Sequence, residues 1–103
     1  MNNHLIPFEG MAWENPSSGV RQKVFLKEGK RLRLVEFSEE FVEEGWCEKG
    51  HAGFVVEGRI WIEFKTGRVE FQAGDGLFIS EGDAHRASVA KGEKAVLVLF
   101  EKA

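Results

Sequence analysis

The stretch WCEKGHAGFVVEG, residues 46–58, places three side chains of metal-binding type ahead of an apolar run that ends in a glycine. They are the thiol of Cys47, the carboxylate of Glu48 and the imidazole of His51. The apolar run is rich in residues that favour a pleated, partly buried strand. The stretch therefore predicts a metal or ligand site where a loop enters a strand.

A second stretch, GDGLFISEGDAH at residues 74–85, has a similar arrangement. Glycines flank a short apolar strand at residues 77–79, and His85 follows. Two histidines, each beside a strand and a glycine turn, indicate one shared site.

Alternating apolar residues and polar turns predict strands along most of the remaining chain. The turn at residues 27–30 and the turn at residues 65–67 each separate the two strands of a hairpin. For residues 38–45 we expect a bent strand in preference to one turn of acidic helix. The expected strands outside residues 46–58 cover residues 20–26, 31–37, 60–64, 68–71, 77–79 and 95–100.

The length of the chain, 103 residues, leaves room for one domain with one core. Residues 1–19 mix prolines, glycines and serines with a few large apolar side chains, which predicts an irregular N-terminal arm. Residues 20–103 are expected to form a single all-β sandwich or barrel, because short strands and glycine turns alternate there without a helical period.

The charge pattern argues against several classes of partner. Fourteen Lys and Arg against seventeen Asp and Glu give a formal charge of −3, and the basic residues are scattered along the chain. Nucleic acid is therefore not expected as a partner. No run approaches the roughly 20 apolar residues of a membrane helix, and the start lacks the features of a secretory signal. We expect a cytoplasmic protein with no membrane partner, which the single cysteine also suits.

The two stretches resemble the two signature motifs of the cupins, whose fold is a double-stranded β-helix, or jelly-roll barrel. The resemblance spans roughly residues 31–100. In that family three histidines and one glutamate bind a metal at the mouth of the barrel. The resemblance implies a cupin barrel that holds a divalent metal ion, a small molecule, or both.

The second cupin motif is matched well. Gly74, Gly82 and His85 have the spacing that the motif requires, with Ser80 in the place of its proline and Val89 in the place of its asparagine. The resemblance makes His85 the best supported metal ligand.

The first motif departs from the family pattern. His51 stands where the family has its glutamate. With a three-residue spacer in the motif, Cys47 takes the place of the second histidine and Gly45 that of the first. With a four-residue spacer, those places fall to Trp46 and Glu44. The fold expectation survives this departure, but the usual ligand set does not.

Three versions of the site remain open. Cys47, His51 and His85 form a set typical of zinc, which leaves one position open for water or substrate. With Glu48 in place of Cys47, the set becomes two histidines and a carboxylate, as in non-haem iron enzymes. Neighbouring residues of an extended segment point to opposite faces, so only one of the two is expected to contribute. In the third version no metal binds and the histidines line an apolar pocket.

Two functions follow from these versions. In the first, the protein is a small metal-dependent enzyme of unassigned reaction, with zinc favoured over iron, manganese or nickel. In the second, it is a metal-free module that binds or senses a small molecule. Any catalysis depends on the metal, since the sequence offers neither a Ser-His-Asp arrangement nor paired carboxylates.

The alternation of the central strand predicts a homodimer. If His51, Gly53 and Val55 face the interior, Phe54 and Val56 point outward. Outward apolar residues on adjacent strands make a patch that monomers rarely expose, and two-fold dimers are the commonest closed assembly.

Overall fold

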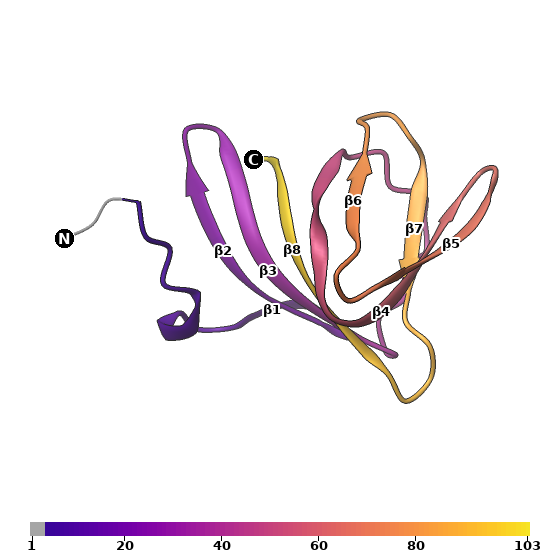
Figure 1. Ribbon diagram of the computed structural model, residues 1–103, viewed down its shortest axis with the longest axis horizontal. Coiled ribbons are helices and arrows are strands. Elements are labelled where there is room, and N and C mark those ends of the chain that lie inside the picture. The colour runs from indigo at the N-terminus through magenta and orange to yellow at the C-terminus, as the bar shows by residue number, and fades with distance from the viewer. Residues whose placement is uncertain (1–3) are drawn as a thin grey trace.

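The computed structural model describes residues 4–103, which form an almost entirely β protein (Figure 1). None of the helices in this part of the chain has the length and apolar character that a membrane span requires. The elements are η1 (Phe8–Gly10), β1 (Glu14–Ser17), β2 (Val20–Lys27), β3 (Lys30–Ser38), β4 (His51–Phe64), β5 (Gly67–Gln72), β6 (Gly76–Ile79), β7 (His85–Ser88) and β8 (Lys94–Lys102).

Both predicted hairpins are confirmed. β2 and β3 are joined by two residues, Glu28 and Gly29, whose φ values of 55° and 73° match the primed turns that suit the twist of paired strands. β4 and β5 are joined by residues 65–66, next to the pair formed by Phe64 and Gly67. The strands expected at residues 77–79 and 95–100 are present as β6 and β8.

The strands are arranged around β8 and β4. The order along the main path is β1-β2-β3-β8-β4-β5, and all these pairs are antiparallel. β6 and β7 both pair with β4, β6 near its start and β7 near its end. One strand therefore holds the two halves of the jelly roll together.

β4 can serve both halves because it bends in the middle. The register with β8 shifts between Val55 and Glu57, and Gly58 has a φ of 74°. The sequence predicted a turn at Gly58, whereas the chain passes through a β-bulge and continues as the same strand. A bulge increases the local bend and twist of a strand, so the first part of β4 pairs with β6 and β8 and the second part with β5 and β7.

The core lies between the two halves and is made by the inward-facing positions of the strands. The largest side chains without contact to solvent come from four places in the chain, β3, both sides of the β4 bulge, and β8. Burying such apolar side chains is the main term that favours folding. These four fully buried side chains are Val35, Val55, Ile60 and Leu97.

The N-terminal arm is less irregular than expected. Residues 1–3 of the predicted arm lie outside the described residues, but β1 adds a short strand to the edge of β2. The Trp13 ring lies 4.2 Å from the Arg21 guanidinium carbon and 4.7 Å from Lys23 Nζ. Lys23 Nζ also donates a hydrogen bond of 2.6 Å to the Phe8 carbonyl. These contacts hold the arm against β2 and bury Lys23.

The prediction of a bent strand at residues 38–45 is wrong. After β3 ends at Ser38 the chain makes a turn and then an irregular segment with no ladder pairing until Cys47. The segment is fixed by side chains instead, since the Phe41 ring packs 4.9 Å from the Phe37 ring. Its acidic residues are mostly exposed, and Phe41 is the apolar side chain that anchors it. The segment therefore lacks the alternation of buried and exposed residues that a strand requires.

Gly58, which follows the bulge, gives a stability prediction. A Cβ atom at Gly58 would lie 2.0 Å from the Lys94 carbonyl oxygen, so Gly58→Ala combines a left-handed backbone with a backbone clash. Gly29 has nearly the same φ and no atom within 4 Å of such a Cβ. We expect Gly29→Ala to cost about 1–2 kcal/mol and Gly58→Ala about 1–3 kcal/mol more, measured by urea unfolding. Equal losses would show that the bulge tolerates a side chain.

Candidate metal and ligand site

Cys47 is fixed opposite His85 before β4 begins. The Cys47 amide donates to the His85 carbonyl at 2.8 Å, and the His85 amide donates to the Cys47 carbonyl at 2.9 Å. This isolated bridge joins the loop ahead of β4 to the first residue of β7. The thiol is thereby placed beside a histidine that lies 38 positions later in the chain.

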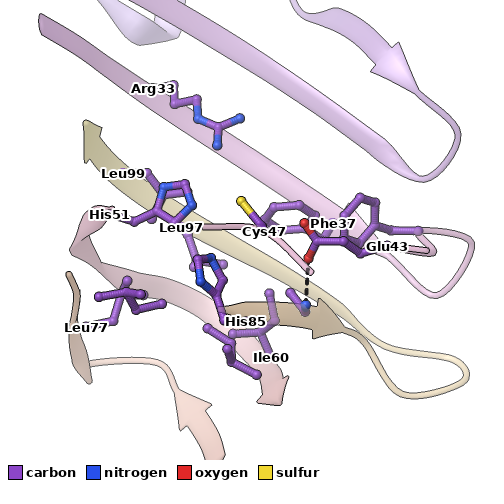
Figure 2. A pocket seen from close by; sticks show the side chains of 14 residues that line it. Arg33, Phe37, Glu43, Cys47, His51, Ile60, Leu77, His85, Leu97 and Leu99 are labelled. Atoms are coloured by element: carbon purple, nitrogen blue, oxygen red, sulfur yellow. Dashed lines mark hydrogen bonds between the residues drawn. The ribbon is translucent and has the colours of Figure 1, made fainter. Parts of the chain in front are cut away.

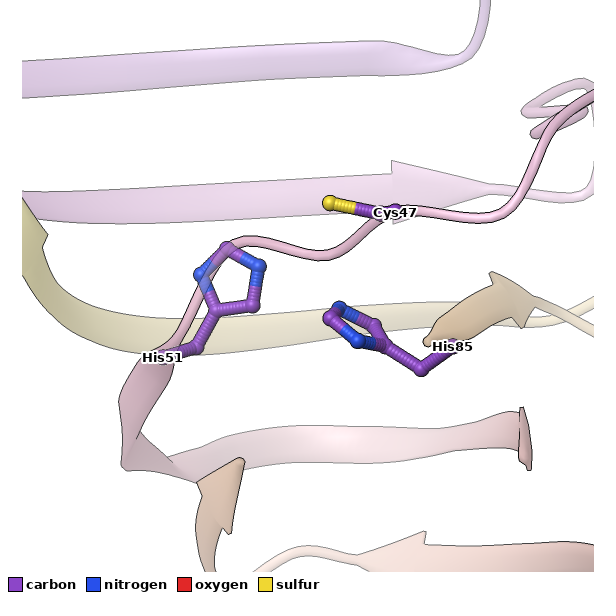
Figure 3. A group of neighbouring side chains, drawn as sticks. All are labelled: Cys47, His51 and His85. Carbon is purple, nitrogen blue, oxygen red and sulfur yellow. The ribbon is translucent and has the colours of Figure 1, made fainter. Parts of the chain in front are cut away.

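His51 completes the group. It is the first residue of β4 and pairs with Ile79 of β6. The donor atoms of Cys47, His51 and His85 all lie within 4.8 Å of one another, and Figure 3 shows the three side chains converging from separate segments. The two imidazole rings meet edge to face, with centroids 5.2 Å apart.

Hydrogen bonds fix which nitrogen of each imidazole is available. Nδ1 of His85 lies 2.8 Å from the Asp83 carbonyl oxygen, which can only accept, so Nδ1 carries the proton. Nδ1 of His51 donates to the carboxylate of Glu101. In the neutral form of each ring the lone pair is therefore on Nε2. A carbonyl or carboxylate behind the other nitrogen is the usual support of a metal-binding histidine.

Glu101 is a buried carboxylate in contact with three side chains, those of Arg31, Arg33 and His51. Arg31 Nε donates to its Oε1 at 3.0 Å, and Arg33 forms an ion pair with the same oxygen. Burial would raise the pKa of Glu101, but the hydrogen bond from His51 and the charges of Arg33 and Arg31 lower it from 4.5 to about 2. Glu101 is therefore ionised at neutral pH and holds His51 by a charge-assisted bond.

The three donor residues lie on the wall of a cavity of about 220 Å³ between the two halves of the fold (Figure 2). Glu43 also lines it, and its Oε1 accepts a hydrogen bond of 2.8 Å from the Ala87 amide. Arg33 is the other ionised residue on the wall. The remaining lining is apolar and comprises Phe37, Phe41, Ile60, Ile62, Leu77, Ile79, Ala87, Leu97 and Leu99.

The structure brings together three of the four side chains that the sequence singled out. Cys47, His51 and His85 form one group, whereas Glu48 is exposed and outside it. Glu48 takes part in the loop through its carbonyl, which accepts a bond of 2.8 Å from the Gly82 amide. That these residues bind a metal stays a prediction.

Sequence reasoning missed Arg33 and Glu101. Both lie at inward positions of their strands, because Arg33 is two residues from the buried Val35 and Glu101 is two residues from the buried Leu99. A charged residue at a core-facing position is rare unless it is paired. The position of each charge on the buried face of its strand was therefore the signal in the sequence that could have identified the pair. Their pairing joins segments about 70 positions apart, which no local pattern reveals.

Comparisons with known proteins place the fold. No family model and no curated protein matches the sequence. Among solved structures, a cupin-2 domain containing protein from Shewanella frigidimarina is 25% identical, with a TM-score of 0.64 over 80% of this chain and 79% of that one. KdgF from Halomonas sp. is 17% identical, with a TM-score of 0.73 over 92% and 91%. The polyketide cyclase RemF from Streptomyces resistomycificus is 14% identical, with a TM-score of 0.79 over 95% and 78%.

These likenesses confirm the architecture that the sequence predicted, an all-β jelly roll in a small domain. At identities of 14–25% they concern the fold, and the cyclase activity in the name of one neighbour belongs to that neighbour.

Glu101 gives a prediction about acid stability in the metal-free protein. Because folding lowers its pKa from 4.5 to about 2, ionised Glu101 contributes stability above about pH 4.5 that is lost as the pH falls toward 2. Glu101→Gln leaves Arg31 and Arg33 without their carboxylate. We expect a loss of roughly 3 kcal/mol at pH 7, the low end for breaking a buried ion pair, and a smaller difference at pH 3. Urea unfolding at both pH values measures it.

Glu93→Gln is the matched control, because Glu93 pairs with Arg59 on the surface. Surface ion pairs contribute little to folding stability, so the urea midpoint of Glu93→Gln is expected to stay near that of the unmodified protein. A pH-independent loss in Glu101→Gln would contradict the electrostatic role of Glu101.

Proposed function

We propose that this chain, which has the fold of a small single-domain cupin, binds one divalent metal ion through Cys47, His51 and His85 and holds a small molecule beside it. Zinc is favoured over iron, manganese or nickel, because one thiolate and two imidazoles are ordinary zinc ligands. The observation that carries the proposal is the convergence of three donor atoms within 4.8 Å, with both Nε2 lone pairs free of the Nδ1 hydrogen bonds.

The donor group fits a zinc ion in size as well as in chemistry. Zinc bond lengths of about 2.0–2.3 Å put tetrahedral ligand atoms roughly 3.3–3.6 Å apart. Small side-chain rotations from a spacing within 4.8 Å are enough to reach this range. The exposed side chain of Glu48 favours the thiolate version of the site over the carboxylate version.

The arrangement leaves room for a fourth ligand. Cys47 in the group agrees with the three-residue spacer, which puts Gly45 where the cupins have their first histidine. Glycine has no side chain to offer, so water or a bound molecule takes that position. A bound zinc ion supplies a Lewis acid or a water of lowered pKa beside the pocket. The chain's own part is to orient the two imidazoles through Glu101 and Asp83 and to shield the site with apolar walls.

A second function, a metal-free module that binds or senses a small molecule, draws on the same apolar cavity. Elemental analysis of protein purified without added metal separates the two. About one ion per chain supports the metal site, and its absence after incubation with zinc or iron leaves the metal-free module.

Single substitutions test the ligands. We expect His51→Ala, His85→Ala and Cys47→Ser each to lose stoichiometric zinc, because each removes one of three protein ligands. In cobalt-loaded protein the thiolate charge-transfer band is expected to disappear in Cys47→Ser. Elemental analysis and absorption spectra measure both effects.

Glu48→Gln and Glu57→Ala are the matched controls, since both side chains are exposed and outside the donor group. They are expected to keep one zinc ion per chain. Retention of zinc in His85→Ala would rule out the site, and loss of metal in Glu48→Gln with retention in Cys47→Ser would move the proposal to a carboxylate-iron site.

The homodimer is also a proposal, supported by the outer face of the sheet that contains β8. Phe54, Val56, Phe78 and Phe100 are exposed by 47–82%. Ala52 pairs with both Phe78 and Phe100, so these side chains lie on adjacent strands and form one apolar patch. A second copy of the chain that placed the same patch against it would remove this surface from water.

Lysine substitutions test the dimer. Phe54→Lys and Val56→Lys put charges in the patch and are expected to yield monomers, whereas Val69→Lys is the matched control. Val69 is similarly exposed, at 44%, but lies on β5, away from the patch. Light scattering at micromolar concentration measures the mass, and a monomer for the unmodified protein would rule the dimer out.

A further inference from the structure

Arg33 is the only lysine or arginine among the described residues that line the pocket. It extends from β3, and Figure 2 shows its guanidinium pointing toward His51 and Cys47. Its side chain is largely buried, with 17% of its surface exposed. A guanidinium in this position can reach a molecule that occupies the proposed open metal position.

The partners of Arg33 leave hydrogen-bonding capacity unused. Nη1 donates to Gln22 Oε1 at 2.9 Å. Nε lies beside Glu101 as an ion pair, but its direction is unsuitable for a hydrogen bond, and it is a buried polar atom without a hydrogen-bond partner in the described residues. Because Nε already faces the Glu101 carboxylate, the nitrogen left to donate to a ligand is Nη2, which has no hydrogen-bond partner in the described part of the chain.

The positive charges next to Arg33 also outnumber the negative ones. Arg31 and Arg33 share the single carboxylate of Glu101, so two positive charges face one negative charge. Glu43 is the carboxylate among the described residues that line the pocket, and its Oε1 accepts a hydrogen bond from the Ala87 amide. The Arg33 side of the pocket therefore carries an excess of one positive charge, which the anionic group of a ligand can balance.

We propose that Arg33 binds the carboxylate of a small organic acid in this pocket, while a second oxygen of the acid takes the open metal position. This inference rests on the proposed metal site. A planar guanidinium matches the two oxygens of a carboxylate, which gives direction as well as charge to the contact.

The pocket also limits the rest of the acid. Its volume of about 220 Å³ lies below the roughly 300–1,000 Å³ of pockets for drug-sized ligands. Its remaining walls are apolar, with Ile60, Ile62 and Leu97 among them. The ligand class is therefore a short carboxylic acid with an oxygen donor next to the carboxylate and an aliphatic body.

The test uses lactate and 2-hydroxyisovalerate, with lactamide and 2-hydroxyisovaleramide as neutral analogues. Cobalt-loaded protein is titrated with each, and the visible absorption of the metal reports binding. We expect both acids to bind at millimolar concentration or below and both amides to bind at least tenfold more weakly. Equal binding of acids and amides, or binding of neither acid, overturns the proposal.

Variants assign the effect to Arg33. Loss of a charge-assisted contact in Arg33→Gln is expected to weaken acid binding on the order of tenfold to a hundredfold, with cobalt stoichiometry unchanged. Arg33→Lys keeps the charge but not the planar fork and should give an intermediate loss. Arg21→Gln has the same change in net charge on the outer face, where Arg21 pairs with Glu36, and should bind acids as before. Unchanged acid affinity in Arg33→Gln overturns the proposal.

Calorimetric titration of metal-free protein separates this inference from the metal proposal. If no metal binds but the acids still bind in an Arg33-dependent way, the metal site fails and carboxylate recognition by Arg33 stands. If metal binds and the acids do not, recognition by Arg33 fails and the metal site stands. Circular dichroism of Arg33→Gln confirms that the variant is folded, and the comparison of acid with amide holds without any variant.

Discussion

The buried carboxylate of Glu101 is the interaction on which the site depends most directly. It lies on β8 and contacts His51 of β4 on one side and Arg31 and Arg33 of β3 on the other. A charge in this place is tolerable only because its partners surround it. The same contacts that make Glu101 acceptable in the interior set the tautomer of His51 and hold Arg33 at the pocket. The orientation of His51 and the position of Arg33 therefore depend on the same side chain.

The bend in β4 is the second requirement. His51 is the first residue of this strand, and His85 pairs with Phe64, its last residue. A straight strand of fourteen residues would hold its two ends more than 40 Å apart, at about 3.3 Å per residue. The bulge before Gly58 turns the strand back across the core, so that β7 returns His85 to the neighbourhood of His51. The glycine that interrupts the apolar pattern is thus part of the reason that the two histidines meet.

Sequence reasoning reached an all-β fold, both hairpins and the strands at β6 and β8, because alternation and glycine turns are local signals. The resemblance to the cupin motifs added the jelly roll. Sequence reasoning also selected Cys47, His51 and His85, which the structure brings together. It did not find β1, whose sequence contains a proline and shows no alternation, or the bulge, which reads as a turn until the partner strand is known. Arg33 and Glu101 were missed because their meaning lies in a contact between distant segments.

The pairing of β3 with β8 also sets an order of events in folding. Arg31 and Glu101 are 70 positions apart, and a chain loop of that size must close before the two strands gain any contact energy. Folds dominated by such distant pairings form on a scale of milliseconds to seconds. His51 acquires its carboxylate partner only when β8 has docked. Until then His51 lacks the carboxylate that orients its ring, and a metal ion that arrives earlier meets an imidazole of unfixed orientation.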